Sequence, residues 1–460
     1  MARDIAPDTA SDAAANAAPE ASSFDGATPG AARAAGYWFE DMPLTRAHWA
    51  AGFVLFFAFV IEAWEMMIII LSAGNIGASF GADAQMIGAL ISAIFLGMIP
   101  GSILWGKLSN VIGRKKSLMI SIGGYGVFPL LSAAAPSLEV LWWVRFFAGV
   151  VLSGALVVTF PLFTELLPVK WRGRGTVFLS AGWPVGTLMA VAVTTLFADA
   201  GWRWVLGASA IVSLWAAPIY LLAPESAYWL AARGRTDDAR GVIRRLSGRN
   251  IPAGGLATAQ GEAHMPFTGI FQGPMLRVTV LNTIVNFCFA WGYWGMTSWL
   301  PSLLARKGLS APEGLGFIAL SALFMFPGYL TASFLTGVYG RKKVMTAFVA
   351  LAAAAGFGFA YSDTMTQLYA WNFMLSFFSL GAWGVWNTWM GEIYDTANRA
   401  AGSAWGVMLQ RVANTIAPVA IGAILVAGSF TTTVAFISLF LAATFVAALF
   451  LPETEGKRLG

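Results

Sequence analysis

Twelve long apolar segments follow one another along this chain, and they leave few ways for it to fold. About 20 apolar residues suffice for a helix to cross the hydrocarbon core of a bilayer. Because lipid offers no partners to backbone polar groups, segments of this kind span the membrane as helices. The sequence therefore predicts an all-α polytopic membrane protein with twelve transmembrane helices. The predicted spans lie near residues 48–72, 86–106, 117–135, 138–166, 175–198, 203–222, 276–304, 314–336, 343–361, 365–391, 401–425 and 430–451.

The composition excludes several other classes of protein. Charged residues make up 11% of the chain, against about 25% in a typical soluble domain. The single cysteine, Cys288, excludes an internal disulfide, and the two histidines, His48 and His264, give no basis for a zinc site or a histidine-based triad. We therefore expect no metal, no cofactor and no enzyme activity. The net charge of +5 is explained by where the basic residues lie rather than by nucleic-acid binding.

The basic residues predict which side of the membrane each loop faces. Lys and Arg gather in the cytoplasmic loops of membrane proteins. With the N-terminus inside, most of the 28 Lys and Arg fall on the cytoplasmic side, and only Arg203, Arg306 and Lys307 fall outside. Arg145 and Arg411 lie within predicted helices. We expect a multi-pass protein of a bacterial inner membrane with both termini in the cytoplasm.

Polar stretches divide the chain into two halves. Residues 1–47 lack the apolar centre of a signal peptide and are interpreted as a disordered cytoplasmic tail whose end lies at the membrane surface. Residues 48–223 and 274–452 each hold six predicted spans. Between them, residues 224–273 form a polar, arginine-rich cytoplasmic loop, and residues 453–460 form a second tail.

The two halves repeat each other at a nearly constant offset. Three matches lie 227 or 228 positions apart, each at an equivalent helix end on the predicted cytoplasmic side. Transporters use parallel six-helix repeats to build a binding site between two halves of the chain. A duplicated transporter scaffold is therefore predicted. The matching pairs are Gly113–Lys116 with Gly340–Lys343, Glu165 with Glu392, Arg172 with Arg399, and Pro224–Ser226 with Pro452–Thr454.

From about residue 40 onward, the chain resembles the major facilitator superfamily. Residues 106–115, after the second span, are similar to the signature loop of that superfamily, in which an acid helps to latch the cytoplasmic side closed. Asn110 and Gly337 stand in the positions of that acid in the two copies. The resemblance implies two pseudo-symmetric bundles of six helices. We interpret the charges at the cytoplasmic edge as a gate, formed by Asn110, Arg114, Glu165, Arg172, Arg341, Glu392 and Arg399.

Further motifs resemble two branches of the superfamily. Residues 224–235 and 452–456 are similar to sugar-porter and organic-ion-porter signatures. Residues 293–301 and 326–329 look more like the bacterial metabolite and aromatic-acid:proton symporters. The second group implies a proton as the coupling ion.

Two acids in the first span, Glu62 and Glu65, share one helical face. Aromatic-acid:proton symporters usually carry two aspartates at these positions. An ionised carboxylate in hydrocarbon costs several kcal/mol, so such residues face a cavity or a charged partner. At about 1.5 Å per residue, Glu65 and Arg145 of the fourth span both lie roughly 10 Å from the outer edge. We expect Glu62, Glu65 and Arg145 to form the proton-coupling site, a permanent buried ion pair being the alternative.

Arg411 lies near the middle of the eleventh span, and its own half offers no acid at that depth. Guanidinium groups bind carboxylates bidentately, and organic-anion carriers of this superfamily often have a basic residue on helix 11. We expect Arg411 to hold an anionic substrate, with pairing to Glu62 across the cavity as the alternative. The other expected substrate-binding residues are Trp64, Trp183, Asn286, Tyr293, Trp294, Trp386, Asn387 and Gln410.

The predicted function is a proton-coupled symporter that imports a small organic anion by alternating access. An aromatic lining with one arginine and few amides favours a carboxylate, aromatic carboxylates included, over a polyhydroxylated sugar. A sugar or polyol porter, an efflux carrier for amphipathic compounds and a membrane sensor are the alternatives. The expected partners are the organic anion and the lipid bilayer, and the expected state is a monomer that binds no nucleic acid.

Overall fold

A computed structural model describes residues 33–40, 42–252, 254–257, 267–395 and 398–454. Long helices dominate this part of the chain, and the β-structure among the described residues is one isolated bridge between Arg33 and Leu256. The prediction of an all-α polytopic membrane protein is confirmed.

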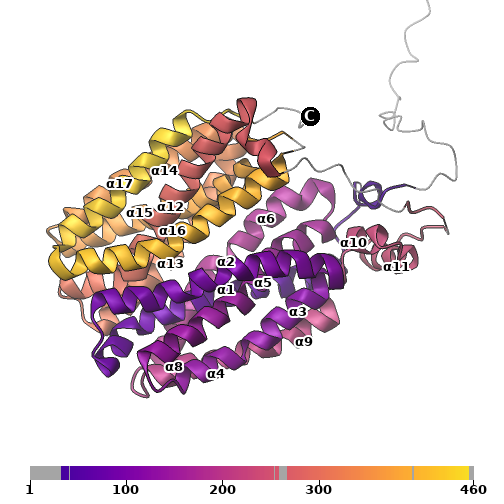
Figure 1. Cartoon of the computed structure of the whole chain (residues 1–460). Coiled ribbons are helices and arrows are strands. Elements are labelled where there is room, and N and C mark those ends of the chain that lie inside the picture. The colour runs from indigo at the N-terminus through magenta and orange to yellow at the C-terminus, as the bar shows by residue number, and fades with distance from the viewer. Residues whose placement is uncertain (1–32, 41, 253, 258–266, 396–397, 455–460) are drawn as a thin grey trace, which may run out of the picture.

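The helices form two bundles that lie side by side, and the chain completes the first before it enters the second (Figure 1). The N-terminal bundle consists of α1 (Arg46–Phe80), α2 (Ala84–Ile112), α3 (Arg114–Tyr125) with α4 (Val127–Ala133), α5 (Leu138–Leu166), α6 (Arg172–Ser180) with α7 (Gly182–Leu196), and α8 (Trp202–Ala208) with α9 (Ala216–Leu222). The C-terminal bundle consists of α12 (Gly273–Arg306), α13 (Ala311–Tyr339), α14 (Arg341–Ala360), α15 (Met365–Glu392), α16 (Arg399–Ala427) and α17 (Phe430–Leu449).

Ten of the spans in the described part of the chain are long and apolar enough to cross a membrane by length and composition. The two remaining spans, α3 with α4 and α15, carry more polar side chains and fall outside that group. Three predicted spans of the N-terminal bundle are interrupted rather than continuous. A turn at Gly126 separates α3 from α4, another at Ala181 separates α6 from α7, and a 3-10 segment, Ser209–Trp215, joins α8 to α9.

The helix ends define two faces of the molecule. The basic face carries the loops Gly113–Lys116 and Gly340–Lys343, and the opposite face carries the starts of α2, α5, α13, α15 and α17. At the opposite face, side-chain oxygens of Asp83 and Ser137 accept from backbone N–H groups of the first helical turn, which is ordinary N-capping. The predicted outer cations bond to carbonyls near helix C-termini, where positive charge is favourable: Arg203 to Ala133 and Ala135, Arg306 to Leu425 and Gly428, and Lys307 to Ser362.

Two short helices in the predicted central loop, α10 (Ala227–Ala232) and α11 (Thr236–Ser247), pack against the basic face of the N-terminal bundle (Figure 1). The ring of Phe39 stacks on Tyr228 of α10, with 5.5 Å between the ring centroids. Phe39 and Met42 are fully buried against protein, whereas Tyr37 is exposed. The predicted disordered tail falls mainly on residues 1–32, which lie outside the described residues.

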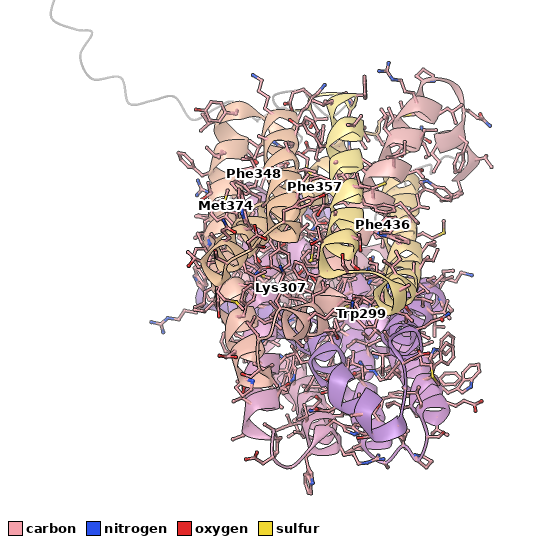
Figure 2. The ribbon with its side chains drawn as sticks, turned by 90° about the vertical axis from the view of Figure 1, so that its left-hand side faces the viewer. Trp299, Lys307, Phe348, Phe357, Met374 and Phe436 are labelled. Carbon is pink, nitrogen blue, oxygen red and sulfur yellow. The ribbon has the colours of Figure 1, made fainter. Side chains whose placement is uncertain are left out.

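The two bundles meet most closely at the opposite face, where α2 packs against α16. A Cβ atom on Gly88 would lie 3.0 Å from the carbonyl carbon of Pro418, and one on Gly422 would lie 2.6 Å from the carbonyl oxygen of Ala84. Only hydrogen fits at both positions, so the helices approach to backbone contact. Trp299 of α12 donates its indole N–H to Pro418 O at 2.9 Å, and Figure 2 shows this residue where the bundles adjoin. This glycine seam closes the opposite face.

Candidate functional site

A cavity of about 850 Å³ lies between the two bundles. Helices α1, α2, α5, α6 and α7 line it from one side, and α12, α13, α15 and α16 line it from the other. Its lining extends from Met66 and Tyr293 to Ser403 and Trp405, in the first turns of α16 at the basic face. The cavity therefore reaches the basic face, while the glycine seam closes it toward the opposite face.

Two opposite charges line this cavity from opposite bundles: Glu62 on α1 and Arg411 on α16. Glu62 is 2% exposed and Arg411 is 7% exposed, and the two lie close enough to interact electrostatically. No direct ion pair joins them among the described residues, and Nη1 of Arg411 lies 3.3 Å from the sulfur of Met98. Oε2 of Glu62 and Nε of Arg411 have no hydrogen-bond partner in the described protein. The site thus keeps charged hydrogen-bonding capacity for a bound group.

Aromatic rings form the deep part of the cavity lining. Trp183 donates its indole N–H to the hydroxyl of Tyr293 at 2.7 Å, which links the two bundles. The ring of Trp294 lies edge-on to Trp183 with 5.4 Å between centroids, and Trp383 lies 5.9 Å from Tyr293. Flat aromatic surfaces next to a buried charge pair suit a small ligand that is both planar and charged.

Six of the predicted substrate-binding residues line the cavity: Trp183, Tyr293, Trp294, Asn387, Gln410 and Arg411. The other three, Trp64, Asn286 and Trp386, are buried and lie outside the lining in the described part of the chain. Trp64 follows Glu62 by two residues, which is about 200° around an α-helix, so it points away from the cavity. Asn286 and Trp386 turn toward each other inside the C-terminal bundle, with the indole N–H donating to Asn286 Oδ1 at 3.0 Å.

Glu65 lies in a separate buried cluster within the N-terminal bundle. Tyr125 of α3 donates its hydroxyl hydrogen to Glu65 Oε2 at 2.6 Å. Arg145 of α5 donates to the Tyr125 oxygen at 3.3 Å and to the backbone carbonyl of Glu65 at 3.2 Å. Arg145 therefore lies beside Glu65, as the depth estimate predicted, but the phenol of Tyr125 stands between the two charged groups. The sequence reasoning missed Tyr125, although it is the only tyrosine in the first five predicted spans.

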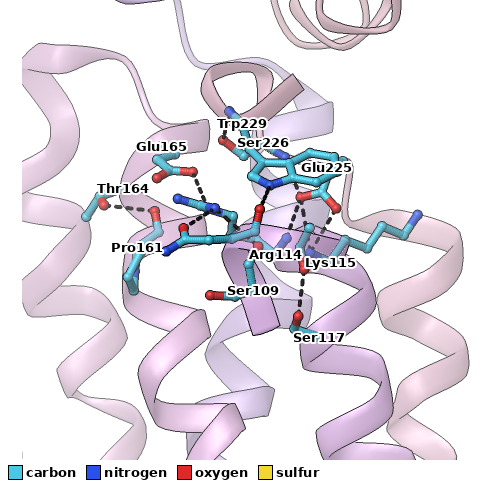
Figure 3. Close-up of polar contacts among 12 residues, drawn as sticks. Ser109, Arg114, Lys115, Ser117, Pro161, Thr164, Glu165, Glu225, Ser226 and Trp229 are labelled. Atoms are coloured by element: carbon cyan, nitrogen blue, oxygen red, sulfur yellow. Dashed lines mark hydrogen bonds and ion pairs between the residues drawn. The ribbon is translucent and has the colours of Figure 1, made fainter. Parts of the chain in front are cut away.

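At the basic face, a polar cluster joins α2, α3, α5 and α10 (Figure 3). Nε of Arg114 lies 3.6 Å from Oε2 of Glu165, and Nη1 of Arg114 donates to Asn110 Oδ1 at 2.9 Å. The carboxylate of Glu225 accepts from the backbone N–H of Arg114 at 2.9 Å and of Lys115 at 3.1 Å. A carboxylate at this position satisfies the free N–H groups of the first turn of α3 and interacts favourably with the helix dipole.

The C-terminal bundle carries the same cluster, which confirms the internal repeat. Nε of Arg341 lies 2.5 Å from Glu392 Oε2, and Glu453 accepts from the backbone N–H groups of Arg341 and Lys342 at 3.1 Å. Gly113 and Gly340 precede the two capped helices at φ 102° and 89°. The repeated Pro-Glu motif was visible in the sequence, but its role as a helix cap requires the fold.

Six of the predicted gate residues make their described side-chain contacts within their own half of the chain: Asn110, Arg114, Glu165, Arg172, Arg341 and Glu392. Besides the pairs of Glu165 and Glu392, Arg172 donates to the hydroxyl of Tyr228 at 2.6 Å, and Arg399 is the first residue of α16. Among the residues that the structure describes, no ion pair connects the two bundles at the basic face. This agrees with a cavity that reaches that face.

Comparison with known proteins places these features in context. The chain matches the family described as Major Facilitator Superfamily over residues 55–360 and 317–460. It is 28% identical to the niacin transporter NiaP of Acinetobacter baylyi, with 91% of this chain and 97% of that protein covered. It is 27% identical to the 4-hydroxybenzoate transporter PcaK of the same organism, covering 80% of this chain and 82% of that protein.

Solved structures share the fold. The inward open conformation of the xylose transporter XylE from E. coli superposes with a TM-score of 0.72 at 18% identity, over 90% of this chain and 98% of that one. The family and these relatives are transporters rather than enzymes, which confirms the prediction that the chain is not an enzyme.

Proposed function

The chain belongs to the major facilitator superfamily of transporters, and from that premise we propose that it is a proton-coupled symporter importing a small aromatic carboxylate. One observation carries the proposal: Glu62 and Arg411 face the same aromatic cavity from opposite bundles without a direct ion pair. A site divided between two bundles can be exposed to either side of the membrane as the bundles rock.

The substrate class follows from the lining. Arg411 offers a guanidinium group that can take a carboxylate through two parallel hydrogen bonds. The rings of Trp183, Tyr293 and Trp294 offer flat surfaces to an aromatic ring. Two relatives are named as transporters of niacin and of 4-hydroxybenzoate, and both compounds are aromatic monocarboxylates. This chemistry favours an aromatic acid over a sugar or polyol.

Charge balance supplies a mechanism of coupling. In the empty cavity, Glu62 offsets the charge of Arg411. A substrate carboxylate that binds Arg411 takes that counter-charge away, and an unpaired ionised glutamate in a buried site is costly. Binding of the anion therefore favours a proton on Glu62. One proton then accompanies one anion across the membrane.

Glu65 is the second acid available for coupling. Its carboxylate is balanced by Arg145 through Tyr125, and it follows Glu62 by one turn of α1. If α1 moves against α5 within the N-terminal bundle and separates Glu65 from Arg145, this acid would bind a proton as well. A second proton would make transport draw on the membrane potential, which is worth about 2.3 kcal/mol per charge per 100 mV.

The orientation follows from the positive-inside rule. The basic face carries most of the Arg and Lys, so we assign it to the cytoplasm of a bacterial inner membrane. The described conformation then opens inward. Parting of α2 from α16 at the glycine seam would open the cavity outward and complete an alternating-access cycle.

Uptake into proteoliposomes tests the proposal directly. Radiolabelled 4-hydroxybenzoate and nicotinate are offered with a pH gradient, alkaline inside, and separately with a membrane potential alone. Accumulation driven by the pH gradient, with little response to the potential, is expected for one proton per anion. Indifference of both acids to the gradient would overturn the symport proposal, and uptake of xylose or a polyol instead would favour the sugar-porter alternative.

A further inference from the structure

Buried amides in the C-terminal bundle form a continuous chain that begins at the cavity. Gln410, which lines the cavity, donates from Nε2 to Asn286 Oδ1 at 2.6 Å. Asn286 donates in turn to the side-chain and backbone oxygens of Asn282 at 2.7 and 2.8 Å. Asn282 donates to the backbone carbonyl of Gly402 and to the hydroxyl of Tyr394, both at 3.1 Å. The amides of Asn282 and Asn286 are fully buried.

The direction of each hydrogen bond in the chain of amides is fixed by neighbouring groups that can only donate or only accept a hydrogen bond. An indole N–H can only donate, so Asn286 must present its oxygen to Trp386. Backbone carbonyls can only accept, so Asn286 and Asn282 must present their NH₂ groups to Asn282 O and Gly402 O. Gln410 meets the oxygen of Asn286 and must donate to it.

The consequence is a fixed acceptor in the cavity. Because Nε2 of Gln410 is committed to Asn286, the group that its amide leaves for the cavity is the oxygen, Oε1. No described residue donates a hydrogen bond to Oε1 of Gln410. This oxygen is not fully enclosed by protein, so a ligand can reach it. The neighbouring Arg411 presents only donors. The two residues together therefore offer an acceptor and a cation.

The scaffold itself does not require the amide chain. The N-terminal bundle repeats the same helices without it, and the equivalent side chains there are mainly apolar. The positions 227 residues before Gln410, Asn286, Asn282 and Tyr394 hold Trp183, Phe59, Leu55 and Leu167. Since packing of the repeated bundle is achieved without these polar groups, their presence in one bundle is explained better by the cavity that they serve.

We infer that Gln410 is a specificity-determining residue and that the preferred anion carries a hydrogen-bond donor, such as a hydroxyl or N–H group, in addition to its carboxylate, so that nicotinate, whose ring nitrogen only accepts, is a weaker ligand than a hydroxybenzoate. Asn286 and Trp386 are positioning residues, which hold the Gln410 oxygen toward the ligand. The inference rests on the proposed function, because Arg411 is taken to bind the carboxylate. Ring substituents that only accept hydrogen bonds meet an oxygen here and are disfavoured.

Binding of matched acids to the purified full-length protein tests this inference. The probes are 3- and 4-hydroxybenzoate, the two methoxybenzoates that replace O–H by O–CH₃, and benzoate, measured by calorimetry or by competition for uptake. At least one hydroxybenzoate should bind about tenfold tighter than its methoxy counterpart, equivalent to about 1.4 kcal/mol. In Gln410→Met this ratio should fall to near one, and in Trp386→Phe it should fall part of the way.

The possible outcomes separate the two proposals. Equal binding of hydroxy and methoxy acids by the wild-type protein, or a ratio that survives in Gln410→Met, would overturn the inference and leave the carboxylate proposal standing. Failure of every acid to bind would overturn both. Because the wild-type ratio is itself decisive, the test does not depend on the variants folding. Gln410→Glu serves as a second variant of similar size. It places an oxygen against Asn286 Oδ1, so the hydrogen bond that positions the side chain is lost.

Discussion

The two bundles repeat the ends of their helices and differ in the middle. At the basic face, the pairs Arg114–Glu165 and Arg341–Glu392 are equivalent, and Glu225 and Glu453 cap equivalent helices. At mid-depth, the N-terminal bundle holds two glutamates with a tyrosine and an arginine, whereas the C-terminal bundle holds one arginine and a chain of amides.

This difference separates the positions that stabilise the helix ends from the positions that face the cavity. Helix ends must satisfy the same free backbone groups in both bundles, so the same capping solution serves twice. The interior positions face a shared cavity, which needs groups of opposite kinds from its two sides. A duplicated bundle can therefore keep its ends and specialise its centre, with buried acids in one half and an arginine with a chain of amides in the other.

The largest expected effect separates the two acids of the N-terminal bundle. Glu62→Gln should abolish accumulation against a gradient, because the cavity loses the carboxylate that the substrate displaces, while exchange of bound substrate continues and binding loses its pH dependence. Glu65→Gln leaves Arg145 buried without its counter-charge, so it should destabilise the protein by about 3–5 kcal/mol. Counterflow assays and thermal unfolding measure these outcomes. Normal accumulation by both variants would refute proton coupling through α1.

The substitution Arg411→Lys tests whether the guanidinium group of the C-terminal bundle binds the substrate carboxylate. A lysine keeps the positive charge but loses the two-pronged geometry, so the KM for an aromatic acid should rise by roughly 30-fold or more, in line with 2–5 kcal/mol for a buried charged pair. Arg306→Lys is the matched control, because Arg306 bonds to carbonyls at the end of α16, away from the cavity. Equal KM changes in both variants would indicate a general effect on folding.

The equivalence of the two basic-face clusters is tested by Gly113→Ala and Gly340→Ala. Both glycines combine φ near 90–100° with extended ψ, a region that costs other residues about 1–3 kcal/mol. An added Cβ would also crowd the capping carboxylate of Glu225 or Glu453. We expect both variants to lower the unfolding temperature by several degrees and by similar amounts. A shift in only one of them would show that the bundles differ here.

The smallest expected effect distinguishes the two ion pairs. Glu392 lies 2.5 Å from Arg341 and also accepts from the hydroxyl of Thr454 at 2.7 Å, whereas Glu165 lies 3.6 Å from Arg114. Glu392→Gln should therefore destabilise the protein more than Glu165→Gln, with both costs within about 1 kcal/mol for partly exposed pairs. Thermal unfolding in detergent measures the difference, and the reverse order would show that distance does not control the strength of these pairs.

Features that depend on position along the chain were predictable from the sequence. The spans, the repeat and the depth match between Glu65 and Arg145 follow from helix geometry alone. Features that depend on which way a helix faces were not. Asn286 and Trp386 lie on predicted helices but turn away from the cavity toward each other. Tyr125, which is 60 positions further along the chain than Glu65, reaches that acid from another helix. Those orientations are set by packing between helices, which a single sequence does not encode locally.

The glycine seam between α2 and α16 also affects how fast the carrier can turn over. Contacts made by interlocked side chains must release several rotamers before they part, whereas Gly88 and Gly422 meet their neighbours through backbone atoms. At these two positions the helices can therefore part with little change of side-chain rotamers. We therefore expect the slow step of the cycle to lie at the cavity, where charges exchange partners, and not at the outer closure.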